Sequence, residues 1–187
     1  MKKSLQKQDI IHIVLVILIM VGSLVLYRTI DLVGIVNNLP TQNTLLALLP
    51  FATFAGVSIF TAGSFYVAVA ELANSMIPIW QLVLVAGVGL TLGDMIFYYF
   101  GRGLEKLLHS TIDPYTTKVA RWLDPKPYWV KILIIYLYVG WSPFPGDILM
   151  LVLSVLRIKP REFLLPVFLG NITFVIMLTI FGIQFLG

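Results

Sequence analysis

Long apolar stretches separated by short polar segments dominate this chain. Five of them contain at most one charged residue each, and each is near or above the roughly 20 residues that an α-helix needs to cross a bilayer. In chain order they are residues 10–27, 45–70, 77–100, 132–156 and 163–186. The pattern therefore predicts five membrane-embedded helical segments and no strands.

The composition narrows the class of protein further. Of 187 residues, 59% are apolar and only 12% are charged, against about 25% charged in soluble domains. The chain has no Cys, which excludes a disulfide framework, a thiolate metal site and a cysteine nucleophile. Its two histidines, His12 and His109, are far apart, so neither a metal centre nor a cofactor is predicted. The net charge of +4 is interpreted through membrane topology and not as a nucleic-acid signal.

Twelve of the thirteen basic residues fall in three groups, and Arg28 is the exception. The groups lie within residues 2–7, 102–131 and 157–161. Because positive loops stay in the cytoplasm, all three groups and the N-terminus are expected inside. No small-x-small cleavage pattern follows residues 10–27, so this segment is interpreted as a retained anchor helix. The expected location is a prokaryotic plasma membrane.

These positions constrain how many times the chain crosses the bilayer. With the second and third basic groups on one side, segment 132–156 must enter and leave by the same face. Its middle carries Pro143, Pro145 and Gly146, which interrupt a continuous helix. The same parity makes segment 45–70, rich in small residues, the second non-spanning segment. Both are therefore predicted to be re-entrant helical hairpins.

The two halves of the chain have matching anatomy. Each hairpin precedes a span, and Leu92-Gly93-Asp94 echoes Leu169-Gly170-Asn171. Leu49-Pro50-Phe51 similarly echoes Ser142-Pro143-Phe144. Because the hairpins enter from opposite faces, the repeats are inverted, as in many transporters.

The predicted fold is a single all-α integral membrane domain over residues 1–187. It comprises the anchor helix 10–27, repeat 1 over 45–100, a basic cytoplasmic loop over 101–131 and repeat 2 over 132–186. Within the loop, Asp113 and Pro114 predict the start of a short amphipathic helix that ends at Asp124-Pro125.

Two motifs resemble those of the DedA family, also called the VTT or SNARE-associated superfamily. The first is Gly89-Leu90-Thr91-Leu92-Gly93-Asp94, followed by a tyrosine and by Gly101-Arg102. The second is Pro143-Phe144-Pro145-Gly146-Asp147, followed by Arg157 and Phe163. The resemblance covers about residues 45–187 and implies opposed re-entrant hairpins and movement of lipids between leaflets. The lipids implied are phospholipids or polyprenyl phosphates, with proton dependence in some members. This chain departs from the bacterial pattern because Pro50 to Gly63 contains no acid, and the nearest is Glu71.

Asp147 is the strongest candidate residue, because a carboxylate at membrane depth normally faces a polar cavity or a partner. Asp94 is either a residue of the headgroup or proton pathway or a buried residue bonded to a hairpin. Arg157 and Arg102 are either phosphate contacts or ordinary positive-inside residues. Asn171 and Glu71 complete the candidate pathway, while Pro143, Pro145 and Gly146 shape the turn.

The sequence leaves several functions open. A lipid transporter and a proton-coupled transporter of a small polar solute fit the same residues, and a non-catalytic assembly factor is a third alternative. An enzyme acting on lipid phosphate, with Asp147 as base, is disfavoured by the shortage of catalytic groups. Membrane lipids and protons are the predicted partners, nucleic acid is not, and the oligomeric state stays open.

Overall fold

A computed structural model describes residues 40–57, 59–123, 126–142 and 146–185. Within these ranges, the side chains of residues 41, 42, 59, 60, 104–121, 123 and 185 are not described. The described residues form six helices and no strand, which confirms the all-α prediction. The helices are α3 (Thr41–Val57), α4 (Ile59–Leu72), α5 (Ile79–Leu123), α6 (Tyr128–Trp141), α7 (Gly146–Val155) and α8 (Pro160–Phe185). The predicted anchor 10–27 lies outside the described residues.

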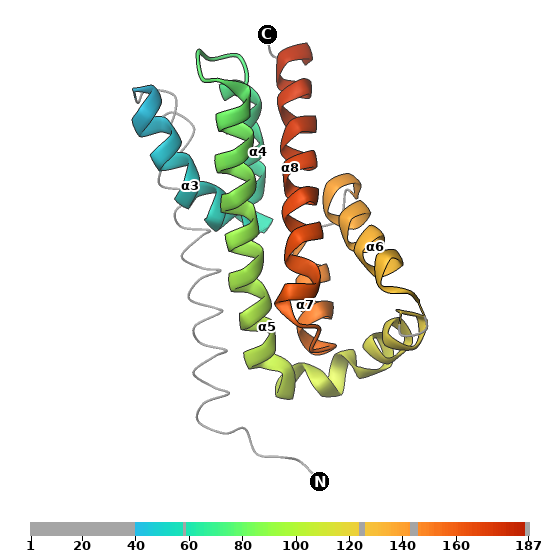
Figure 1. Ribbon diagram of the computed structural model, residues 1–187. Helices are drawn as coiled ribbons and strands as arrows, with labels where there is room; N and C mark the ends of the chain where they lie inside the picture. The colour runs from blue at the N-terminus through green and yellow to red at the C-terminus, as the bar shows by residue number, and fades with distance from the viewer. Residues whose placement is uncertain (1–39, 58, 124–125, 143–145, 186–187) are drawn as a thin grey trace.

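Two antiparallel helices, α5 and α8, form the centre of the molecule (Figure 1). Each contains a 25-residue apolar stretch, Ile79–Gly103 and Pro160–Gln184, that is long enough to cross a membrane. At 1.5 Å per residue each stretch is about 38 Å long, more than the hydrocarbon thickness of about 30 Å.

Each long helix has a buried face and an exposed apolar face. On both helices, every fourth residue along one face is at most 5% exposed. These buried positions are Leu82, Ala86, Leu90, Asp94 and Tyr98 on α5, and Phe163, Val167, Asn171, Val175 and Thr179 on α8. The exposed apolar positions include Leu84, Val88, Leu92 and Ile96 on α5, and Leu165, Leu169, Ile176 and Ile180 on α8. A helix that is apolar on its outer face as well as its inner one is typical of a membrane protein.

The four shorter helices form two pairs, and the chain turns back within each pair (Figure 1). Helices of 10 to 17 residues are about 15 to 26 Å long, shorter than the hydrocarbon layer. The pairs exchange partners: α3 packs on α5 and α4 on α8, whereas α6 packs on α8 and α7 on α5. Each pair therefore bridges the two long helices.

Small residues allow the closest of these contacts. A Cβ added to Gly93 of α5 would lie 2.7 Å from the Cα of Gly56 in α3. On the other side, a Cβ added to Gly170 of α8 would lie 2.8 Å from the Cβ of Val139 and 3.2 Å from the backbone nitrogen of Gly140 in α6. Close backbone approach at small residues is the usual basis of helix packing in membranes.

Two details of the sequence prediction are wrong. Helix α5 continues without a break to Leu123, so no separate helix begins at Pro114 with Asp113 as its cap, and most of the predicted loop is helical. The ribbon of α5 bends in its lower part (Figure 1).

The second wrong detail concerns the Leu49-Pro50-Phe51 echo. Pro50 lies inside α3, whereas its supposed counterpart, Pro143, falls between α6 and α7. The first pair breaks after Val57 instead. Proline is tolerated inside membrane helices because neighbouring groups can satisfy the freed carbonyl.

Candidate functional site

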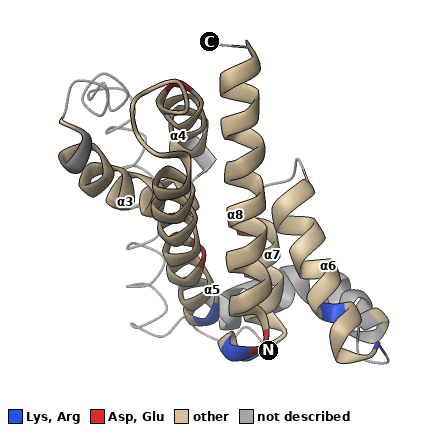
Figure 2. Cartoon of the chain, turned by 45° about the horizontal axis from the view of Figure 1, so that its top comes forward, with Lys and Arg blue, Asp and Glu red and all other residues tan. Residues whose placement is uncertain are grey.

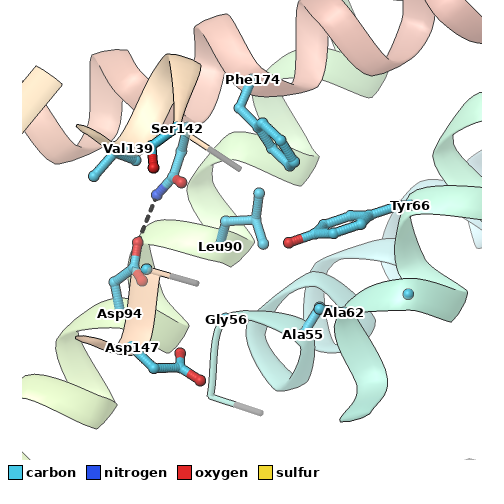
Figure 3. Close-up of a pocket in the computed structure, with 13 residues that line it drawn as sticks. Ala55, Gly56, Ala62, Tyr66, Leu90, Asp94, Val139, Ser142, Asp147 and Phe174 are labelled. Carbon is cyan, nitrogen blue, oxygen red and sulfur yellow. Dashed lines mark hydrogen bonds between the residues drawn. The ribbon is translucent and has the colours of Figure 1, made fainter. Parts of the chain in front are cut away.

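A cavity of about 510 Å³ lies where the turns of the two helix pairs approach the middle of α5 and α8 (Figure 3). All six described helices contribute to its walls. The lining residues are Ala55, Gly56, Ala62, Gly63, Tyr66, Leu90, Asp94, Val139, Ser142, Gly146, Asp147, Asn171 and Phe174. An apolar cluster centred on α3 and α4 lies on one side of the cavity, and a second one, built from α6 and α7 with the lower part of α5, lies on the other.

Asp94 and Asn171 join the two long helices across the cavity wall. The amide nitrogen of Asn171 donates to Oδ2 of Asp94 at 2.7 Å and to Oγ1 of Thr91 at 3.1 Å. Thr91 in turn donates to the carbonyl oxygen of Gly87 at 2.8 Å. Asp94 and Asn171 are each 5% exposed, so this is a buried network whose donors are all satisfied. The two residues that echo each other in sequence are therefore direct partners.

Asp147 lies in the first turn of α7, as expected, and its carboxyl group lines the cavity. The preceding residue, Gly146, brings the start of α7 against Asp94: an added Cβ would lie 3.3 Å from Oδ1 of Asp94. The turn residues Pro143 and Pro145 lie outside the described residues. Asp147 of α7 and Asp94 of α5 therefore both lie at the N-terminal end of α7 (Figure 3).

Tyr66 and Phe174 are cavity residues that sequence reasoning missed. Their ring centroids are 5.1 Å apart in an edge-to-face arrangement. The hydroxyl of Tyr66 points into the cavity (Figure 3). Tyr66 lies among the small residues of α4. A tyrosine within such a segment was the sequence feature that could have identified it as a cavity residue.

Three other candidates lie away from the cavity lining. Arg102 is exposed on α5, with its guanidinium carbon 6.0 Å from the centre of the Tyr98 ring. Glu71 lies one residue before the end of α4. Arg157 is exposed in the connection between α7 and α8. The structure therefore brings together Asp94, Asp147 and Asn171 but not these three.

Arg157 has an unusual backbone, with φ of 55°. It follows the end of α7, where the amide of Ile158 donates to the carbonyl of Leu153 and the amide of Arg157 to that of Ser154. This is a Schellman cap, whose left-handed position is usually a glycine. Tyr98 holds the same turn by donating to the carbonyl oxygen of Ile158 at 2.6 Å.

The cavity lies near mid-depth of the two long apolar stretches. Asp94 is 15 residues from the start of Ile79–Gly103 and 9 from its end. Asn171 is 11 residues from the start of Pro160–Gln184 and 13 from its end. A cavity that holds a few polar side chains in the middle of two membrane-length helices with apolar outer faces is typical of helical membrane proteins.

The comparisons with known proteins identify the family within this class. The sequence pattern of the VTT domain matches residues 49–184, which include every described residue of the cavity. The chain therefore belongs to the DedA/VTT family of membrane proteins. No curated protein and no solved structure matches it.

Proposed function

We propose that this protein moves lipid headgroups between the two leaflets of the membrane, through the cavity, while the acyl chains stay in the bilayer. The proposed substrates are phospholipids and polyprenyl phosphates. The proposal involves no covalent chemistry and no cofactor.

The observation that carries this proposal is the group of polar side chains in the cavity. It contains Asp94, Asp147 and Asn171 at mid-depth, where a headgroup meets its highest barrier in plain hydrocarbon. Polar groups at this depth replace the hydrogen bonds that the headgroup loses when it leaves water. The exposed apolar faces of α5 and α8 leave room for acyl chains outside the helices.

The residues take different roles along this path. Asp147, at the start of α7, and the bonded pair of Asp94 and Asn171 offer polar contacts to the headgroup within the membrane. Arg102 and Arg157, both exposed, would meet a phosphate near the cytoplasmic face. A proton carried by Asp94 or Asp147 would make the movement proton-dependent.

The helix pairings support the inverted repeat. If α3, α4 and α5 correspond to α6, α7 and α8, the packing contacts correspond as well. The contact of α3 with α5 matches that of α6 with α8, and the contact of α4 with α8 matches that of α7 with α5. Gly140, Gly146 and Asp147 follow Gly56, Ala62 and Gly63, respectively, by 84 residues, and all of them except Gly140 line the cavity. This relation supports the proposal that both helix pairs are re-entrant hairpins. In the proposed topology the lower ends of α5 and α7 and the N-terminus lie in the cytoplasm of a prokaryotic cell.

A second candidate function is proton-coupled transport of a small polar solute. The buried carboxyl group of Asp94, held by Asn171, favours it because such groups often carry protons in transporters.

A leaflet-exchange assay tests the proposal. Purified protein is reconstituted into vesicles that contain a phospholipid labelled on its acyl chain, and dithionite then bleaches the outer leaflet. We expect the inner-leaflet label to become accessible, and Asp147→Ala to slow this about tenfold, equivalent to about 1.4 kcal/mol of barrier. Glu162→Gln, an acid in the first turn of α8 outside the cavity, is the matched control and should exchange normally.

The outcomes separate the alternatives. Normal exchange in Asp147→Ala would remove that residue from the mechanism. No exchange of any lipid by the unmodified protein would overturn the proposal and favour a solute transporter or a non-catalytic assembly factor.

A further inference from the structure

The cavity side chains that can carry a full charge at neutral pH are acidic. Among the cavity's described lining residues, Asp94 and Asp147 are acids and none is Lys or Arg. Residues 143–145, which precede α7 in the sequence and lie outside the described residues, are Pro-Phe-Pro and have no charged side chain. A headgroup at mid-depth therefore meets carboxyl groups and no positive side chain from these residues.

The nearest basic residues along the same helices are distant. Arg102 follows Asp94 by eight residues of α5, and Arg157 follows Asp147 by ten. At 1.5 Å per residue, Arg102 lies about 12 Å from Asp94 along the axis of α5. Helix α7 also extends about 12 Å from Asp147 to its end at Val155, and Arg157 follows that end. In Figure 2 the blue basic residues gather at the lower ends of the helices, away from the acid within α5. Phosphate recognition therefore belongs to that end and not to the cavity.

The N-terminal end of α7 could in principle attract an anion. Its first turn, however, already carries Asp147, and Gly146 places the carboxyl group of Asp94 against it. Two acids therefore offset the positive end of the helix dipole. An additional anion would be repelled by both.

The aromatic pair on the opposite wall suits a cation. The rings of Tyr66 and Phe174 line the cavity, and aromatic faces bind ammonium groups, most strongly when water is excluded. The Tyr66 hydroxyl, which points into the cavity, adds a further oxygen acceptor (Figure 3).

We infer that the cavity binds the positively charged part of a headgroup, a primary or quaternary ammonium. This inference rests on the proposed function and narrows its substrates to amine-bearing phospholipids. Lipids whose headgroup is only anionic, including polyprenyl phosphates, pass poorly.

The first test measures the charge preference without lipid movement. The chain has no native Cys, and a Cβ at Gly63 meets nothing within 4 Å, so Gly63→Cys gives a single thiol in the cavity wall. Its reaction rates with trimethylammonioethyl and sulfonatoethyl methanethiosulfonate are compared with those of Met76→Cys, which is 99% exposed. Ser142→Cys provides a second cavity thiol, from the other hairpin.

We expect the ratio of cationic to anionic reagent rates to be about tenfold higher in the cavity than at Met76→Cys. Adding Asp147→Asn should bring the ratio close to the reference. An equal ratio, a preference for the sulfonate or no reaction at either cavity thiol would overturn the inference.

The second test compares lipids with the same labelled acyl chain and different headgroups. Phosphatidylcholine and phosphatidylethanolamine should exchange about tenfold faster than phosphatidylglycerol. Equal rates for all three would refute the charge selectivity and leave the proposed function standing. If no lipid moves, the proposed function and the assignment of lipid substrates are both refuted. The ratio of thiol reaction rates still measures the charge preference of the cavity.

Discussion

Gly93 lies where α5 and α3 cross most closely, and adding one methyl group there should separate them. The new Cβ would lie 2.7 Å from the Cα of Gly56, and the backbone oxygen of Thr53 is also in contact with it. Non-bonded carbons rest about 3.5–4.0 Å apart, so the helices must move by about 1 Å. Neither obstacle is a flexible side chain, so relief requires a shift of backbone.

Overpacking of this kind costs about 1–3 kcal/mol. For a chain of 150–250 residues each kcal/mol corresponds to about 2–4 °C in Tm. Gly93→Ala should therefore lower the Tm by about 2–12 °C. The measurement is thermal unfolding in one detergent, followed by the folded fraction that remains on size-exclusion chromatography.

Gly63→Ala is the matched control, because it makes the same change within a helix where nothing lies within 4 Å of the new Cβ. It should leave the Tm unchanged or raise it, since alanine favours a helix over glycine by up to about 1 kcal/mol. If both variants unfolded at the same temperature, the close crossing of α3 and α5 would be refuted.

Three further predictions concern the turn after α7 and the cavity. Tyr98→Phe removes the hydrogen bond to the carbonyl oxygen of Ile158 and should cost about 1 kcal/mol, measured as a Tm lower by about 2–4 °C; an unchanged Tm would show that the bond adds nothing. Arg157→Gly should raise the Tm by relieving the left-handed backbone at φ 55°, whereas Arg157→Ala should not, and equal effects of the two would contradict the cap geometry. Gly63→Asp added to Asp147→Asn should restore part of the lipid exchange that Asp147→Asn loses, because the proposed inverted repeat pairs these two positions; exchange as slow as in Asp147→Asn alone would count against that pairing.

The sequence identified the acids of the cavity because charge is rare in an apolar chain. Asp94 and Asp147 stood out for this reason, and the repeated Leu-Gly-Asp and Leu-Gly-Asn strings pointed to Asn171. In the structure these residues lie together, and Asp94 and Asn171 are bonded. A short repeat was informative here because its two copies meet at the centre of the molecule.

The remaining features depend on packing that the sequence pattern does not encode. Helix α5 runs past Asp113 and Pro114, where local capping rules predict a new start. The first helix pair breaks after Val57, with no proline there, and Pro50 is accommodated within α3. Tyr66 became a cavity residue only because α4 returns beside α8.

The proposed path of the chain through the membrane is tested most directly by finding which side of the bilayer three introduced cysteines face. Lys126, Lys159 and Met76 are exposed, and the chain has no other Cys to react. Each is replaced singly by Cys and labelled with a membrane-impermeant maleimide in intact cells and in inverted vesicles. Lys126→Cys and Lys159→Cys should react only in inverted vesicles, from the cytoplasmic side, and Met76→Cys only in intact cells. Labelling of Lys159→Cys from the same side as Met76→Cys would mean that α6 and α7 cross the bilayer, and the re-entrant hairpin would be wrong.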